Sequence, residues 1–164
     1  MKNLYISLMA LPLFAFANFG VGITSHDIDD EGLGYGSLSW RLATLNGVYE
    51  NRNDNLAFQA KVGLGLSDDS SDDSDGDAHD LELNNYVQLK GMYFMNNNIY
   101  AAFTYSRIDF DIYVSWQDET YGDSMNDFGF QLGYRDNNLD IFVGPSLDKD
   151  GSEILEIGFT YFFN

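Results

Sequence analysis

The sequence contains no cysteine, only 2 prolines, and 8 lysines and arginines against 26 aspartates and glutamates. The absence of cysteine excludes disulfides, cysteine nucleophiles and thiolate metal sites. The shortage of basic side chains argues against nucleic acid as a partner, because binding it depends on neutralising phosphates. No stretch reaches the roughly 18 apolar residues of a membrane-spanning helix. Glycine (16 residues) and aromatic residues (16% of the chain) are abundant instead, which is typical of strands rather than helices.

The first 17 residues have the pattern of a secretory signal peptide. Lys2 precedes a short apolar core over residues 4–14, and Ala15-Phe16-Ala17 has the A-x-A form of a cleavage site. The core is too short to span a membrane and remain there. The sequence therefore predicts an exported protein, with a signal peptide over residues 1–17 and one domain over residues 18–164.

Period-two alternation of apolar and polar residues, the pattern of β-strands, recurs along that domain. It is clear over residues 56–67, 81–95, 128–135, 139–144 and 154–163, and weaker over 18–25, 36–48 and 99–114. In the segment 99–114 the alternation changes phase near Arg107, which indicates either a β-bulge or a strand leaving the membrane. The sequence thus predicts an all-β protein with eight strands.

The connections between these strands alternate in length. Short connections rich in Asn suit tight hairpins, since Asn tolerates left-handed backbone conformations; they are residues 51–55, 96–98 and 136–138. Longer or acidic connections lie between them, at residues 26–32, 68–80, 115–126 and 148–152. Short turns at one end, long loops at the other and an even strand count predict an eight-stranded antiparallel up-and-down transmembrane β-barrel, with both termini at the short-turn end.

The composition of the two strand faces indicates which one meets lipid. The polar face carries Gly, Ser, Gln and single charges, which fit the narrow interior of an eight-stranded barrel, whereas the large apolar side chains fit lipid. Charged residues on the polar face are predicted to pair in a network inside the lumen, because buried charges require partners. The predicted network comprises Arg41, Lys61, Glu82, Lys90, Arg135, Asp140 and Glu156.

Aromatic residues predict a girdle at each membrane interface. The girdle near the short turns comprises Phe19, Phe58, Tyr93, Tyr134, Tyr161 and Phe163, and the outer one Trp40, Phe110, Tyr113 and Trp116. A soluble lipocalin-like barrel that binds an apolar ligand is the alternative, since its strands alternate with the apolar face inward. In that case Phe128, Phe130 and Leu132 point to the interior.

The chain ends in EILEIGFTYFFN, an alternating strand with a lipid face of Leu155, Ile157, Phe159, Tyr161 and Phe163. An open edge is not tolerated in lipid, so this strand is predicted to pair with the first one. The segment looks like the terminal strand that the outer-membrane barrel assembly machinery recognises, although Asn164 follows the last aromatic.

In pattern and length, residues 18–164 resemble the small eight-stranded outer-membrane barrels, the group of the OmpA-type membrane domain, OmpX, Ail and the opacity proteins, some of them called porin family. The resemblance implies a monomeric barrel in the outer membrane of a Gram-negative cell, in contact with lipid and lipopolysaccharide. It implies no single activity. A wide diffusion pore is disfavoured, because eight strands enclose no channel of porin size.

The acidic segment 68–80 is the first place where chemistry is conceivable. Asp73, Asp75, Asp77 and Glu82 approximate the spacing of an EF-hand calcium loop, but the flanking segments are predicted strands rather than helices. The favoured interpretation is a solvated, acidic surface loop with no cofactor. Loose association of Ca²⁺ or Mg²⁺ with the clustered carboxylates is the alternative.

A lipid-modifying barrel enzyme is the second conceivable chemistry. It needs a histidine and a serine with a carboxylate, and only His26 and His79 are present, both in predicted loops. Ser25 and Asp27 flank His26, but neighbours on a strand point to opposite faces. No catalytic residue is therefore assigned, and the predicted role is structural or one of surface interaction.

Overall fold

The computed structural model describes residues 17–30, 38–72, 76–115, 117–149 and 151–163. They form nine β-strands: β1 (Ala17–Asp30), β2 (Leu38–Asn53), β3 (Leu56–Gly65), β4 (Asp68–Asp72), β5 (Ala78–Phe94), β6 (Ile99–Val114), β7 (Glu119–Asp136), β8 (Leu139–Asp148) and β9 (Glu153–Phe163). Within these ranges no helix is long and apolar enough to cross a membrane. The predicted signal peptide lies outside the described residues except for Ala17, which begins β1.

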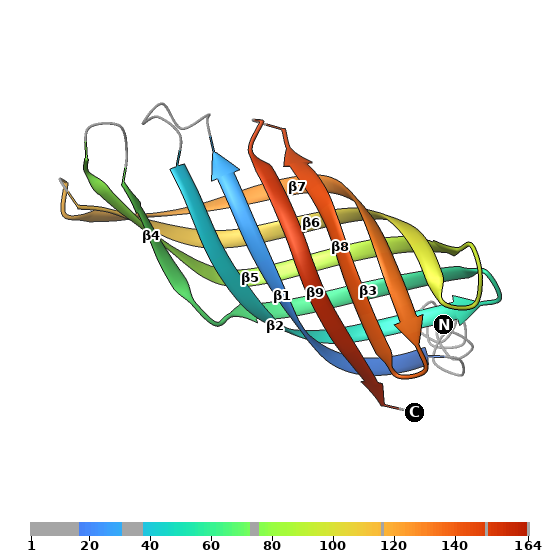
Figure 1. Ribbon diagram of the computed structural model, residues 1–164. Helices are drawn as coiled ribbons and strands as arrows, with labels where there is room; N and C mark the ends of the chain where they lie inside the picture. The colour runs from blue at the N-terminus through green and yellow to red at the C-terminus, as the bar shows by residue number, and fades with distance from the viewer. Residues whose placement is uncertain (1–16, 31–37, 73–75, 116, 150, 164) are drawn as a thin grey trace, which may run out of the picture.

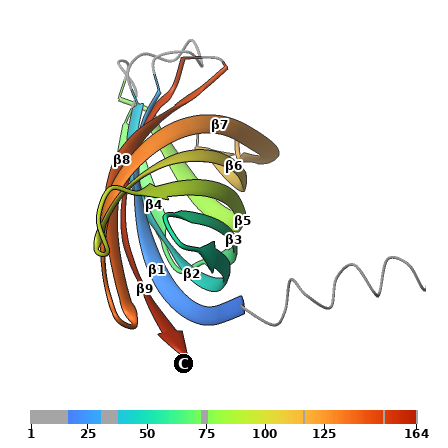
Figure 2. The same cartoon turned by 90° about the vertical axis from the view of Figure 1, so that its right-hand side faces the viewer.

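The strands form one antiparallel sheet that closes on itself (Figures 1 and 2). Its order is β3-β2-β1-β9-β8-β7-β6-β5-β4, and the additional pairing of β3 with β5 completes a ring of eight strands. The predicted antiparallel barrel is confirmed. The ninth strand, β4, follows β3 and pairs with β5 alone; it lies in the segment 68–80 that was predicted to be a loop.

The break between β3 and β4 lies where two backbones approach closely. A Cβ atom on Gly65 would stand 1.7 Å from the Leu83 carbonyl oxygen, so only glycine fits there. In β5 the register with β6 shifts between Leu83 and Asn85 at the same level. A bulge bends its strand and increases the local twist.

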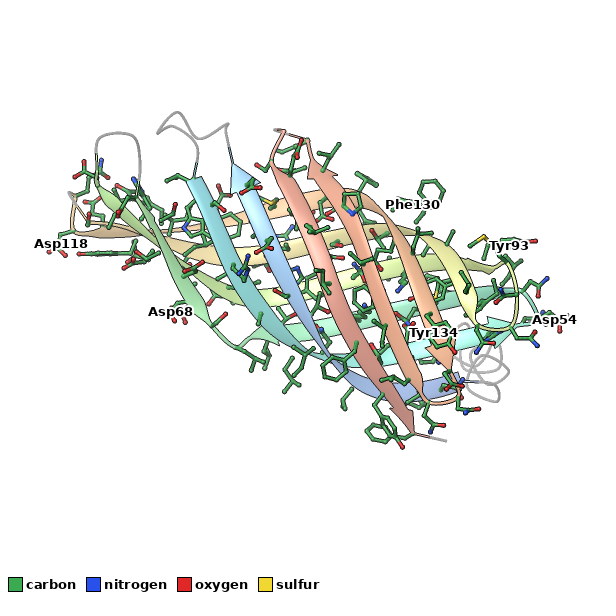
Figure 3. The ribbon with its side chains drawn as sticks, viewed as in Figure 1. Asp54, Asp68, Tyr93, Asp118, Phe130 and Tyr134 are labelled. Carbon is green, nitrogen blue, oxygen red and sulfur yellow. The ribbon has the colours of Figure 1, made fainter. Side chains whose placement is uncertain are left out.

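The two ends of the barrel differ as predicted. Two-residue turns join β2 to β3 and β7 to β8, with Asp54 and Asn137 in the left-handed region (φ 50° and 47°). The first strand pairs with the last, Phe19 opposite Phe163, which places both termini at this end. Asp68 and Asp118 lie at the opposite end from Asp54 (Figure 3).

The long acidic segments are the main difference from the predicted fold. Residues 68–72 form β4, residues 78–80 begin β5, and residues 119–126 belong to β7. The prediction of loops there was wrong because these polar residues pair with β5 and β6, in which polar residues continue to alternate with Leu, Ile and Phe, but in the opposite sense. These strands extend the barrel wall rather than leaving it.

Strand β6 shows how the sense of the alternation reverses. Its outward side chains are Phe103 and Tyr105 and then Arg107, whereas its inward ones are Thr104 and Ser106 and then Ile108 and Phe110. Inward and outward positions alternate without interruption along β6, so the phase change near Arg107 is no bulge in this strand. It marks the level at which the outside of the wall changes from apolar to polar.

Candidate functional site

Between that level and the short turns, each of the eight strands of the ring exposes apolar side chains on the outer surface. Phe103 is 75% exposed, Phe128 70% and Leu56 63%. We call this surface the apolar belt; it includes the predicted lipid face of β9, namely Leu155, Ile157, Phe159, Tyr161 and Phe163, which are 41–56% exposed. Phe128, Phe130 and Leu132 all point outward, so the inward apolar face that a lipocalin-like barrel needs is not present in these residues.

Behind the belt, the half of the interior near the short turns holds a buried ion pair. Arg135 of β7 donates from Nη2 to Glu50 Oε2 of β2, and Gln59 Nε2 donates to the same oxygen at 3.1 Å. The guanidinium also lies 3.8 Å from the centre of the Phe162 ring. Both charged side chains are nearly inaccessible to solvent, so each depends on the other for compensation.

A second group of charges adjoins the pair. Lys90 Nζ donates to the Tyr100 hydroxyl at 2.8 Å, and Tyr100 donates to Asp140 Oδ1 at 2.8 Å. Lys61 Nζ has no hydrogen-bond partner among the described residues but stands 3.6 Å from the centre of the Phe142 ring. Lys90 approaches the same ring at 4.3 Å, so Phe142 stabilises both ammonium groups through its π face.

Glu156 of β9 is the centre of a third group, nearer the middle of the barrel. Tyr86 donates to Oε1 at 2.8 Å, and Gln88 and Gln131 both donate to Oε2. His26 lies against the same carboxylate, with Nδ1 3.3 Å from Oε1. These contacts come from β1, β5, β7 and β9, so one carboxylate joins opposite walls of the barrel.

On the side of Glu156 that faces away from the short turns, an apolar cluster fills the interior. We call it the plug; it comprises Ile28, Leu38, Trp40, Leu42, Leu81, Leu83, Tyr86, Ile108, Phe110, Met125 and Ile154. Its members are at most 7% exposed. The interior is therefore filled by packed apolar side chains at one level and by buried charged side chains between that level and the short turns.

Five of the seven residues predicted for the lumen lie inside: Lys61, Lys90, Arg135, Asp140 and Glu156. Arg41 and Glu82 do not, and their predicted position was wrong. Both lie beyond the belt, where apolar side chains fill the interior and the polar side chains face outward. The prediction also missed Glu50 and Asp127, whose inward phase follows from the alternation in β2 and β7, and His26, which lies in β1 rather than in a loop.

The outer aromatic girdle was wrong for the same reason. Trp40 and Phe110 belong to the plug, Tyr113 is half-buried, and Trp116 lies outside the described residues. The girdle near the short turns agrees with the structure: its six members are 46–56% exposed.

We call the wall beyond the belt the rim; it comprises residues 38–43, 68–72, 78–85, 107–114 and 119–126. Its outer face is acidic, with Asp68, Glu82 and Asp111 in consecutive register across β4, β5 and β6. Arg41 is bound to Asp27 at 2.6 Å, a contact that raises the pKa of Arg41, and Arg107 is bound to Asp109 at 2.9 Å. The two basic residues of the rim are thus already engaged.

Side chains rather than backbone groups join β2 to β4 in the rim. The amides of Ser39, Arg41 and Ala43 donate to Ser71 Oγ (3.1 Å), Asp69 Oδ2 (2.6 Å) and Ser67 Oγ (3.0 Å). We call these three contacts the seam. The acidic, serine-rich segment around β4 therefore has a structural role. Its side-chain oxygens accept the hydrogen bonds that the backbone carbonyls of a neighbouring strand would otherwise accept from β2.

The metal candidate has limited support. No group of three or more His, Cys, Asp or Glu side chains within the described ranges is placed to hold a metal ion. Of the candidate residues Asp73, Asp75, Asp77 and Glu82, the first two lie outside those ranges. Glu82 faces outward on β5.

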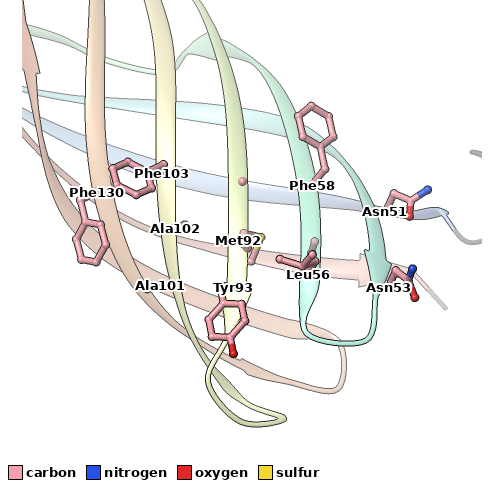
Figure 4. A pocket seen from close by; sticks show the side chains of 12 residues that line it. Asn51, Asn53, Leu56, Phe58, Met92, Tyr93, Ala101, Ala102, Phe103 and Phe130 are labelled. Atoms are coloured by element: carbon pink, nitrogen blue, oxygen red, sulfur yellow. The ribbon is translucent and has the colours of Figure 1, made fainter.

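Among the hollows in the surface, two lie on contrasting parts of the barrel. One, of about 560 Å³, lies on the apolar belt over Gly91 and Ala101, bordered by Phe58, Tyr93, Phe103 and Phe130 (Figure 4). The other, of about 580 Å³, opens at the rim above the plug and is lined by Trp40, His79, Ile112, Gln117, Tyr121 and Asp123. The lining of the first is mainly apolar, whereas the lining of the second contains both apolar and polar side chains.

Comparison with known proteins identifies the fold. No family model and no curated protein matches the chain. The solved structure of Ail, the attachment invasion locus protein of Yersinia pestis, matches with a TM-score of 0.56 at 14% identity, over 90% of this chain and 97% of that one. Ail in complex with the heparin analogue sucrose octasulfate matches with a TM-score of 0.55, also at 14% identity and over the same shares of both chains. The N-terminal β-barrel domain of Pseudomonas aeruginosa OprF is 13% identical, over 88% and 97% of the two chains, with a TM-score of 0.49. The chain has the fold of a small outer-membrane β-barrel.

Proposed function

We propose that this chain is a structural and surface-contact protein of the Gram-negative outer membrane, a closed barrel that holds an acidic rim outside the bilayer. The observation that carries the proposal is the reversal along β6, where Phe103 and Tyr105 face outward below Arg107, and Ile108 and Phe110 face inward above it. Water on one side of this level and lipid on the other explain both patterns at once.

The location is tested by cell fractionation with gel electrophoresis of boiled and unboiled samples. A closed barrel that resists detergent migrates differently before and after heating. We expect the chain in the outer-membrane fraction with a heat-dependent shift in mobility. Recovery from the soluble periplasmic fraction without a shift would contradict the proposal.

The barrel is proposed not to conduct solutes, because the plug and the charged groups beneath it occupy the interior. Eight strands leave an interior that side chains just fill. Planar-bilayer recordings of the purified protein test this directly, and we expect no steps of porin size. Regular large steps would show that the plug does not seal the barrel.

The rim is proposed to contact cationic rather than anionic partners. The net charge of the chain is −18, and the described basic residues of the rim, Arg41 and Arg107, are bound to Asp27 and Asp109. A polyanion such as the heparin analogue bound to Ail would meet repulsion here. Lipopolysaccharide, also anionic, would need bridging divalent cations.

Calorimetric titration with a lysine-rich peptide and with sucrose octasulfate separates these possibilities. We expect only the peptide to bind, with an affinity that falls as salt is added, because exposed charges are screened. The variant Glu82→Gln/Asp111→Asn removes two carboxylates of the rim, so we expect it to bind the peptide more weakly than the unmodified chain. Tighter binding of the octasulfate than of the peptide would refute the assignment.

The proposal includes no enzymatic activity. His26 and His79 are buried, at 0% and 1% exposure, so neither imidazole is accessible to a lipid at the outer surface. Mass spectra of lipid A from cells with and without the gene test this point. We expect identical spectra; a mass difference that depends on the gene would support the lipid-modifying alternative.

A further inference from the structure

Asp127 of β7 is a buried carboxylate with no counterpart. Its side chain is 0% exposed, and neither oxygen has a hydrogen-bond partner among the described residues. The other interior carboxylates are bound: Glu50 to Arg135, Asp140 to Tyr100, and Glu156 to four side chains. An isolated buried carboxylate is strongly unfavourable unless it is paired or binds an ion, so this one requires an explanation.

The side chains around Asp127 are hydroxyls. Ser106 is its cross-strand neighbour on β6, and Ser146 on β8 also lies beside it. In the adjoining row Thr104, Gly129 and Ser146 are in register across β6, β7 and β8. Because Gly129 has no side chain, the Thr104 hydroxyl and Ser146 approach over it: a Cβ there would stand 2.6 Å from Thr104 Oγ1 and 2.7 Å from Ser146 Cβ.

These hydroxyls are as buried as the carboxylate and largely unengaged. Thr104 Oγ1 and Ser146 Oγ have no hydrogen-bond partner within the described residues, and both side chains are below 5% exposure. Gln88 and Gln131 direct their nitrogens to Glu156, which leaves both of their amide oxygens without a partner. These four unpartnered atoms are oxygens, the ligands that hard cations prefer.

The charge of this group of side chains points the same way. Asp127 is the one carboxylate among them, and the other members are neutral hydroxyls. One monovalent cation neutralises this carboxylate, whereas a divalent ion would leave an excess of positive charge.

We propose that Asp127, with the hydroxyls of Ser106, Thr104 and Ser146, forms a binding site for one Na⁺ ion inside the barrel, directly beneath the plug. The ion neutralises the unpaired carboxylate and joins β6, β7 and β8 from within. It is a resident of the folded barrel rather than a transported species, because the plug separates it from the rim.

The test is the heat-dependent gel shift of the purified barrel in detergent, measured in NaCl and in choline chloride at equal ionic strength. We expect a midpoint about 5 °C higher in NaCl for the unmodified chain, since a ligand that binds only the folded state stabilises it. Asp127→Asn, which keeps the shape and removes the charge, has the same midpoint in both salts. Asp136→Asn, an exposed change of equal charge on the same strand, retains the full difference.

Ser146→Ala is the second variant, for the case in which Asp127→Asn does not fold. It keeps the carboxylate and removes one ligand. We expect the sodium concentration that gives half of the stabilisation to rise about tenfold, which corresponds to the loss of one contact as strong as a hydrogen bond. Broadening of the ²³Na resonance by the protein, lost in either variant, gives a readout independent of stability. Equal midpoints in NaCl and choline chloride, or a larger effect of CaCl₂ than of NaCl, would overturn the proposal.

Discussion

Removing one member of the Arg135–Glu50 pair should destabilise the barrel more than removing the charges of both. Arg135→Met leaves Glu50 charged at 0% exposure, and Glu50→Gln leaves the guanidinium charged at 6%. Breaking a buried pair in this way costs about 3–5 kcal/mol. The Phe162 ring lies 3.8 Å from the guanidinium and offsets part of that cost for Glu50→Gln, by about 1–2 kcal/mol.

The double variant Glu50→Gln/Arg135→Met is the informative comparison. It contains no unpaired charge, and its glutamine still accepts the hydrogen bond from Gln59. We expect it to lie within about 2 kcal/mol of the unmodified chain, since replacing a buried pair by neutral side chains is often close to neutral. The two single effects should therefore not add.

Urea unfolding of the barrel in lipid vesicles, followed by tryptophan fluorescence, measures all four free energies of unfolding. Trp40 in the plug reports on the packed interior. If both single variants lose less than about 1 kcal/mol, the pair behaves as a hydrated surface pair. The argument that the interior is closed to water would then fail.

Three further predictions use positions with a clear structural contrast. Phe110→Ala in the plug should cost about 3–5 kcal/mol in urea unfolding, whereas Phe103→Ala on the same strand, 75% exposed, should cost about 1 kcal/mol or less; equal losses would show that the plug is not packed. Gly65→Ala should prevent the heat-modifiable form from appearing, because a Cβ meets a carbonyl oxygen at 1.7 Å, while Gly91→Ala, with open space around it, should fold normally. Asp69→Ala should speed hydrogen exchange of the β2 amide that it accepts from, by about tenfold; an unchanged rate would mean that the seam is not formed in solution.

Much of the barrel is predictable from the sequence because both faces of most strands are informative. In β9 the residues from Leu155 to Phe163 alternate without exception, and lipid on one side and a crowded lumen on the other leave only one assignment. The pairing of β9 with β1 follows from the requirement for a closed edge. Asp54 and Asn137 mark two tight turns by their tolerance of the left-handed region.

The rim is where the sequence alone misleads. The alternation in β6 reads as a change of phase near Arg107, but the strand continues and its surroundings change instead. In β5 the alternation in the sequence shows no change of phase, but a bulge near Asn84 shifts the side chains by one position. Leu83 therefore points inward while Val87 points outward. The prediction assumed that each face of a strand has the same surroundings along its whole length. It therefore placed Arg41 in the lumen, whereas the side chain lies on the outer surface. Tertiary position relative to the membrane decides these cases, and no local pattern encodes it.

The seam between β2 and β4 has a consequence for the width of the barrel. Strands joined by backbone groups keep a fixed spacing of about 4.8 Å, whereas β4, which is joined to β2 through the side chains of Asp69 and Ser71, stands off by the length of a side chain. The circumference of the rim is therefore adjustable by substitution, without a change in strand number. Exchanging serine for aspartate along β4 lengthens the spacer, and the reverse exchange shortens it. The mouth above the plug can thus evolve in diameter while the part of the wall that faces lipid stays constant.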